Sequence, residues 1–144
     1  MPQPPSALEQ IQALLSGRAL QFVKAYTGKS ELTGEEYKAV FTVSRQQVLD
    51  HVQTHGLPPG GWNSQPGGFD GLYMIERDGR FAVYFQERGI AFDESVHNSK
   101  AEAEIATAKW LLGLSGTGLY TVSFTQAKAP WWSRLKPNFL RSSE

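Results

Sequence analysis

Hydrophobic residues recur at intervals of three and four along the beginning of the chain, which is the spacing of an amphipathic helix. The first helix predicted in this way runs from Ala7 to Ser16. Ser6 and Glu9 have the spacing of a capping box at its start, and Gly17 suits its end. Its apolar stripe consists of Leu8, Ile11, Leu14 and Leu15.

Two more helices are predicted by the same signals. One is capped by Ser44, with Gln47 completing the box, and ends at Gly56; its inward residues are Val48, Leu49 and Val52. The other begins after Ser99, with Glu102 in the capping position, and reaches about Leu112. Its inward residues are expected to be Ala101, Ile105, Ala108, Leu111 and Leu112.

Alternation of apolar and polar residues predicts a β-hairpin in the second half of the chain. The runs Leu72–Arg77 and Arg80–Gln86 flank Asp78-Gly79, a dipeptide favoured in type I′ turns because both positions tolerate positive φ. A two-residue turn pairs Arg77 with Arg80, Ile75 with Ala82, and Tyr73 with Tyr84.

The two faces of this hairpin differ in what they predict. One face, expected to join the core, carries Leu72, Met74, Phe81, Val83 and Phe85. The other carries Tyr73, Ile75, Ala82 and Tyr84 and is unusually apolar for a solvent face. We therefore expect a helix or a partner to cover it, and a homodimer through the Tyr73/Ile75/Tyr84 face is one form that this partner could take.

The remaining segments complete the list of expected elements. A third strand, from Ile90 to Val96, follows a turn through Glu87-Arg88-Gly89. Tyr37–Val43 and Leu119–Thr125 also alternate and predict strands, whereas residues 18–27 fit either a strand or a helix. The sequence thus predicts an α+β fold in which helices pack largely on one face of an antiparallel sheet.

Residues 57–71 contain three prolines and five glycines, which excludes regular structure and predicts a long loop. A loop of this length in a small domain is typically functional or mobile. The chain has 144 residues, and the parts on either side of the loop are short for independent cores, so we expect one domain over residues 1–144.

Composition and charge narrow the class of protein. The chain has no cysteine, which excludes disulfides and thiolate metal sites, and a formal net charge of zero, which argues against a general phosphate-binding protein. No apolar run is long enough for a membrane span, and Met1–Pro5 lacks the start of a signal peptide, so we expect a cytoplasmic protein. The charge is uneven, however, because residues 69–104 carry eight acidic and four basic side chains.

Several catalytic or ligand motifs are incomplete. Gly28-Lys29-Ser30 ends like a phosphate-binding loop, but Val23 stands where that loop needs glycine. Gly113–Thr117 resembles a nucleophile elbow without its closing glycine. His51 and His55 share a helix face and could hold zinc, but the ligand set is incomplete, so a polar helix face is the favoured interpretation. We expect no cofactor, no metal and no catalytic residue.

The residues with the best claim to a binding role lie in the long loop and near the hairpin. Trp62, Phe69 and Asp70 come from the loop, and a loop tryptophan either anchors an interface or is pinned into its own domain. The hairpin end contributes Glu87, Arg88, Asp93 and Glu94. If paired carboxylates there acted as acid and base, burial would have to separate their pKa values.

The tail at residues 126–144 interleaves aromatic and basic side chains, among them Trp131, Trp132, Arg134 and Lys136. Such a segment could stack nucleic-acid bases. It could also fold back, burying both tryptophans and placing its cations on the acidic middle region. Folding back is favoured, because a free tail would expose a large apolar patch and no wider basic face supports nucleic acid.

Residues 71–112 read GLYMIERDGRFAVYFQERGIAFDESVHNSKAEAEIATAKWLL, a hairpin followed by a Tyr-Phe-x-Glu-Arg-Gly turn, a third strand, an acidic pair and a capped helix. This stretch resembles small cytosolic immunity proteins of bacterial polymorphic toxin and contact-dependent inhibition systems. The resemblance implies a non-enzymatic protein that binds one cognate toxin domain, often a nuclease, and blocks it. Two alternatives from other classes are a regulatory or adaptor module and a small enzyme or ligand-binding protein.

Overall fold

The computed structural model describes residues 3–120 of the chain. The tail and most of the strand expected at Leu119–Thr125 lie outside these residues. The described elements are, in order, α1 (Ala7–Leu15), α2 (Ala19–Thr27), α3 (Gly34–Val40), α4 (Arg45–His55), β1 (Gly71–Arg77), β2 (Arg80–Glu87), β3 (Ile90–His97) and α5 (Lys100–Leu114). The predicted α+β class is confirmed.

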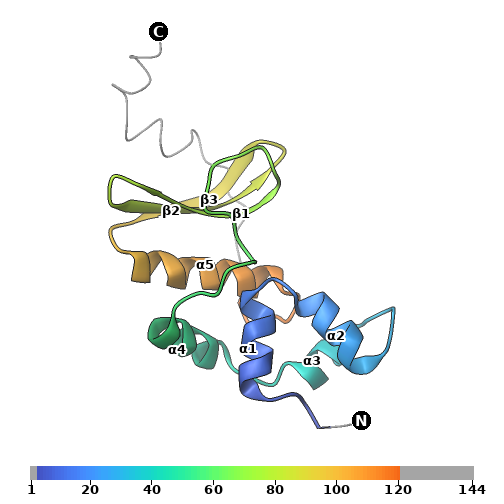
Figure 1. Ribbon diagram of the computed structural model, residues 1–144. Helices are drawn as coiled ribbons and strands as arrows, with labels where there is room; N and C mark the ends of the chain where they lie inside the picture. The colour runs from blue at the N-terminus through green and yellow to red at the C-terminus, as the bar shows by residue number, and fades with distance from the viewer. Residues whose placement is uncertain (1–2, 121–144) are drawn as a thin grey trace.

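The strands form one antiparallel sheet in the order β1-β2-β3, and α5 runs beneath it (Figure 1). The four N-terminal helices lie on the far side of α5 from the sheet, so that α5 is the middle layer (Figure 1). A helix in this position needs apolar residues on more than one side. Accordingly, its buried residues are Ala103, Thr107, Ala108, Trp110, Leu111 and Leu112.

One hydrophobic core joins the segments before and after the long loop. It includes Leu14 and Leu15 of α1, Val48 and Val52 of α4, and Leu112 of α5, all nearly or fully buried. Apolar residues of β1 and β2 pack into the same cluster. The helices and the sheet therefore stabilise each other through shared buried surface.

The predicted hairpin and its register are confirmed. Arg77 pairs with Arg80, Ile75 with Ala82, and Tyr73 with Tyr84. Asp78 and Gly79 have φ of 56° and 77°, as a type I′ turn requires. The turn between β2 and β3 repeats this geometry, because Arg88 and Gly89 have φ of 52° and 78°.

Both faces of the hairpin are buried. The face predicted as core, with Leu72, Met74 and Val83, packs in the main cluster. On the other face, Tyr73, Ile75 and Tyr84 are 1%, 2% and 0% exposed and form a second small cluster. The rings of Tyr73 and Tyr84 stack with centroids 5.1 Å apart. A homodimer through this face would therefore require these side chains to be uncovered first.

The strand predicted at Tyr37–Val43 is wrong, because most of this segment is helix α3. Thr33 and Glu36 form a reciprocal capping box at its start. Tyr37, Val40 and Phe41 follow at helical spacing and pack in the core, which outweighs the apparent alternation. The ambiguous residues 18–27 are also largely helical, as α2, with Ala19 and Val23 buried.

The predicted helices α1, α4 and α5 are confirmed, with small differences. Ser6 and Ser44 form complete capping boxes, and the Ser99 side chain accepts a hydrogen bond from the backbone of Glu102. Ala101 was expected to face inward but is exposed, whereas Ile105 packs against the core. None of the helices within residues 3–120 has the length and apolar character to cross a bilayer.

Candidate protein-binding site

The long loop between α4 and β1 is fixed at its base by backbone pairing with β1. Asn63 donates its backbone N–H to the Leu72 carbonyl at 2.8 Å and accepts from the Met74 N–H at 2.9 Å. Its side-chain amide donates to the same Leu72 carbonyl at 3.0 Å. The Pro/Gly-rich segment thus adds one parallel bridge at the edge of the sheet.

The tip of the loop is held by two side chains of the sheet. The Tyr73 hydroxyl donates to the Phe69 carbonyl at 2.6 Å. The Gln86 amide donates to the Gly67 carbonyl at 2.7 Å and to the Phe69 carbonyl at 3.1 Å. Gln86 is 7% exposed, so these bonds form in a largely water-excluded position where a lost partner would be costly.

A third connection joins the loop to the turn between β2 and β3. Asp70 accepts a hydrogen bond from the backbone N–H of Arg88 at 2.8 Å. The structure therefore brings together four of the predicted site residues, Phe69, Asp70, Glu87 and Arg88, at one end of the sheet. We call these four residues the loop–hairpin end. Its aromatic member, Phe69, is 79% exposed.

Trp62 does not belong to this group. Its indole N–H donates to the Pro58 carbonyl at 3.2 Å, and its ring packs against the main core. These contacts are those expected of a tryptophan pinned into its own domain.

Asp93 and Glu94 lie farther along β3, at an irregularity that the sequence does not reveal. Val83 pairs with Ser95 and Phe85 with Phe92, so two β3 residues stand opposite the single residue Tyr84. This is a β-bulge. Asp93 has a φ of 46°, which is unusual for a residue other than glycine. Burial, with smaller contributions from Tyr73 and Glu94, raises the pKa of Tyr84.

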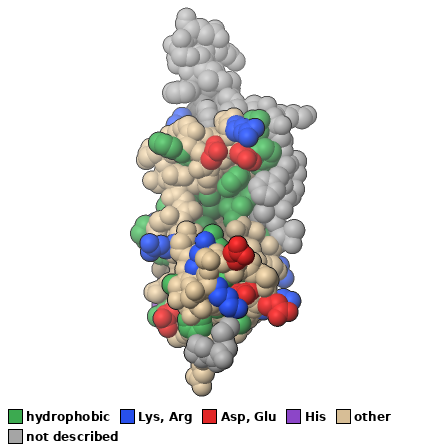
Figure 2. All heavy atoms as spheres, turned by 90° about the vertical axis from the view of Figure 1, so that its right-hand side faces the viewer, with side chains coloured by type: hydrophobic (Ala, Val, Ile, Leu, Met, Phe, Trp, Pro, Cys, Tyr) green, Lys and Arg blue, Asp and Glu red, His purple; other side chains and the backbone are tan. Residues whose placement is uncertain are grey.

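An apolar cleft of about 500 Å³ opens next to the loop–hairpin end. It lies between the start of β1 and end of β2 on one side and the α1–α2 connection and the end of α5 on the other. Figure 2 shows hydrophobic side chains gathered in a hollow at this end of the molecule, with charged side chains above and below. Its apolar lining residues are Leu14, Ala19, Leu20, Tyr37, Leu72, Phe85, Leu111 and Leu114.

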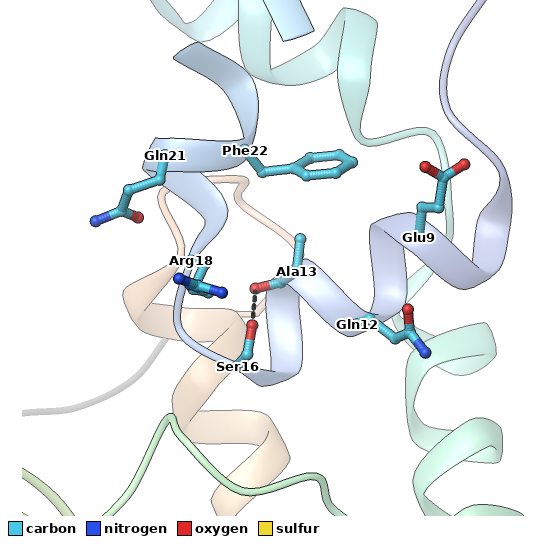
Figure 3. A pocket seen from close by; sticks show the side chains of 7 residues that line it. All are labelled: Glu9, Gln12, Ala13, Ser16, Arg18, Gln21 and Phe22. Carbon is cyan, nitrogen blue, oxygen red and sulfur yellow. Dashed lines mark hydrogen bonds between the residues drawn. The ribbon is translucent and has the colours of Figure 1, made fainter. Parts of the chain in front are cut away.

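A more polar hollow of about 430 Å³ lies between α1 and α2 (Figure 3). Phe22 lies across it, and the amides of Gln12 and Gln21 point in different directions (Figure 3). Glu9 and Ser16 are engaged locally, since Glu9 bonds to Ser6 and Ser16 donates to the Ala13 carbonyl. The polar groups of this hollow do not converge on one point as they would around a specific small ligand.

The incomplete motifs have local structural roles. Gly28 ends α2 in a left-handed conformation, and Gly113 lies within α5. The rings of His51 and His55 are 4.6 Å apart, and burial followed by the neighbouring His55 lowers the pKa of His51. Residues 3–120 contain no group of three or more His, Asp or Glu side chains placed to hold a metal ion.

Comparisons of the chain with protein-family models, curated proteins and solved structures find no match.

Proposed function

We propose that this protein is a non-enzymatic immunity protein that binds a cognate bacterial toxin domain through the loop–hairpin end and neutralises it. The observation that carries this proposal is an exposed phenylalanine on a loop whose backbone is held in place. Phe69 is 79% exposed, yet its own carbonyl accepts hydrogen bonds from both Tyr73 and Gln86.

Fixing an exposed aromatic residue in this way favours tight binding. Association costs free energy for every loop that must become ordered, and a loop already held in its bound conformation avoids part of that cost. This lower ordering cost increases affinity, which an inhibitor needs when both it and its toxin are present at low concentration. Large aromatic side chains are also among the residues that contribute most to interfaces.

The charges beside Phe69 support a basic partner. Asp70 and Glu87 are exposed at the loop–hairpin end, and Asp93 is exposed on β3. Arg88 is the basic member of this surface. Acidic residues steer association with a positively charged surface, such as the substrate-binding face of a nuclease, and set the orientation of the complex.

The proposal predicts that an adjacent gene encodes a toxin domain, and co-expression with that domain tests it. We expect the wild-type protein to restore growth of cells that make the toxin and to co-purify with it. Phe69→Ala should weaken the complex by at least about 30-fold, the effect of a hot-spot residue. Leu8→Ala is a suitable control, because Leu8 is a 52%-exposed hydrophobic residue on α1, outside the loop–hairpin end.

The proposal fails if the wild-type protein neither restores growth nor co-purifies with the toxin domain. If it protects but Phe69→Ala and Leu8→Ala bind equally well, the function stands and the assignment of Phe69 as a contact residue is wrong.

A further inference from the structure

The apolar cleft and the loop–hairpin end form one continuous surface. Gly71, which directly follows Asp70, lines the upper wall of the cleft, and so does Phe85, two residues before Glu87. A partner bound over Asp70 and Glu87 would therefore also lie over the opening of the cleft. The two features have to be considered as parts of the same contact area.

The opposite wall of the cleft exposes apolar surface that the fold itself does not use. Leu20 at the start of α2 is 44% exposed, and Leu114 at the end of α5 is 41% exposed. These two residues are far apart in the chain, and they line one cleft because α1, which connects to α2, packs against α5. Covering them with a partner would be favourable, because it removes apolar area from water.

The cleft has room for an inserted side chain. Its volume of about 500 Å³ lies within the range of ligand pockets, roughly 300–1,000 Å³. Gly17, Gly71 and Gly116 contribute to its lining and have no side chains to fill it. A leucine or phenylalanine of a partner could enter between Leu20 and Phe85.

We propose that the apolar cleft receives one large hydrophobic side chain of the toxin domain, and that basic residues flanking this side chain meet Asp70 and Glu87. This inference rests on the proposed function, and it adds the kind of segment that is recognised. An apolar pocket beside a charged rim is the usual arrangement around the residues that dominate binding energy. Phe69 would then contact the partner from one side while the partner's own anchor fills the cleft.

Substitutions in the cleft test this inference against a matched surface change. Leu20→Glu and Leu114→Glu place a carboxylate at the opening, whereas Leu8→Glu makes the same change on α1 at a residue that is 52% exposed and does not line the cleft. With the purified toxin domain in titration calorimetry, we expect each cleft variant to raise the Kd at least about 30-fold. Leu8→Glu should leave the Kd within about 3-fold of wild type, as expected outside the contact area.

Two further measurements separate a lost contact from a lost fold and test the charged rim. Melting curves identify any variant that is destabilised, and Leu20→Ala then replaces Leu20→Glu, since it shortens the side chain without adding a charge. Asp70→Asn keeps an oxygen that can accept from Arg88, and together with Glu87→Gln it should lower the association rate and weaken its dependence on salt.

The results for the cleft variants, for the Asp70 and Glu87 variants and for the wild-type protein test separate parts of the proposal. If the cleft variants bind as tightly as wild type, or lose no more affinity than Leu8→Glu, the cleft is not the receiving site, although the proposed function stands. Unchanged association rates for Asp70→Asn and Glu87→Gln would refute the proposal that basic residues of the partner meet these two acids. If the wild-type protein shows neither binding nor protection, the proposed function itself fails and this inference fails with it.

Discussion

Replacing Gly61 with alanine should destabilise the fold, because the long loop packs there directly on the end of α1. A Cβ atom at this position would lie 2.9 Å from the Leu15 carbonyl oxygen and 3.1 Å from the Ser16 carbonyl carbon. It would also lie 2.9 Å from Cδ2 of Leu111. The leucine could rotate away, but the two main-chain atoms can move only if α1 or the loop shifts.

The size of the effect follows from these contacts. Overpacking of a close-packed interior typically costs about 1–3 kcal/mol. For a domain of this size, each kcal/mol corresponds to roughly 4 °C in the melting temperature, so Gly61→Ala should melt about 4–12 °C below wild type. Because Gly61 also lines the apolar cleft, the same shift would alter the surface beside the loop–hairpin end.

Gly68→Ala is the matched control within the same loop. Nothing lies within 4 Å of a Cβ atom at Gly68, and its φ is not in the positive region. Its melting temperature should equal that of wild type or rise slightly, since alanine reduces the conformational freedom of the unfolded chain. Equal melting temperatures for wild type, Gly61→Ala and Gly68→Ala would refute the close packing of loop and helix.

Three other substitutions test separate parts of the fold. Gln10→Leu removes the buried side-chain oxygen that accepts hydrogen bonds from the backbone N–H groups of Thr42 and Val43, at 2.8 and 3.0 Å. The free energy of unfolding, measured with denaturant, should fall by about 1–3 kcal/mol. Gly79→Val should lower stability by about 1–2 kcal/mol, because valine resists the φ of 77° in the hairpin turn; an unchanged melting temperature would contradict this. Hydrogen bonds from the Thr33 side chain and backbone lower the pKa of Glu36 to about 2, so its carboxylate stabilises the fold above pH 4.5 and this contribution is lost as the pH falls toward 2. Melting temperatures of Glu36→Gln should accordingly fall less than those of wild type between pH 4.5 and pH 2, and parallel curves would show that the carboxylate is not responsible.

The elements that could be predicted from sequence are those specified by neighbouring residues. The Ser6–Glu9 box and the Asp78-Gly79 turn each encode their geometry within four residues, and both were predicted correctly. The strand predicted at Tyr37–Val43 was wrong because the apolar residues there fit both the alternation of a strand and the spacing of a helix. Its capping box, Thr33 with Glu36, was the available signal that distinguishes helix from strand.

The site could be predicted only in part, because its organisation depends on contacts across the fold. An exposed aromatic residue and nearby acids are visible in the sequence. The hydrogen bonds by which Gln86 holds the loop tip are not visible in the sequence, since its amide donates to carbonyls 17 and 19 positions away. The cleft cannot be predicted from sequence either, because Leu20 and Leu114 come to line one opening only after α1 has packed against α5.

The way in which the loop tip is held has a consequence for how this protein could change over generations. Tyr73 and Gln86 bind main-chain carbonyls of residues 67 and 69, and residues 64–69 are all exposed. A main-chain carbonyl is present whatever side chain a residue carries. Mutations at the exposed tip can therefore replace the proposed recognition surface while the supporting bonds and the core remain as they are. If the proposed toxin partner varies, a lineage could in this way acquire new specificities one residue at a time without losing its folded scaffold.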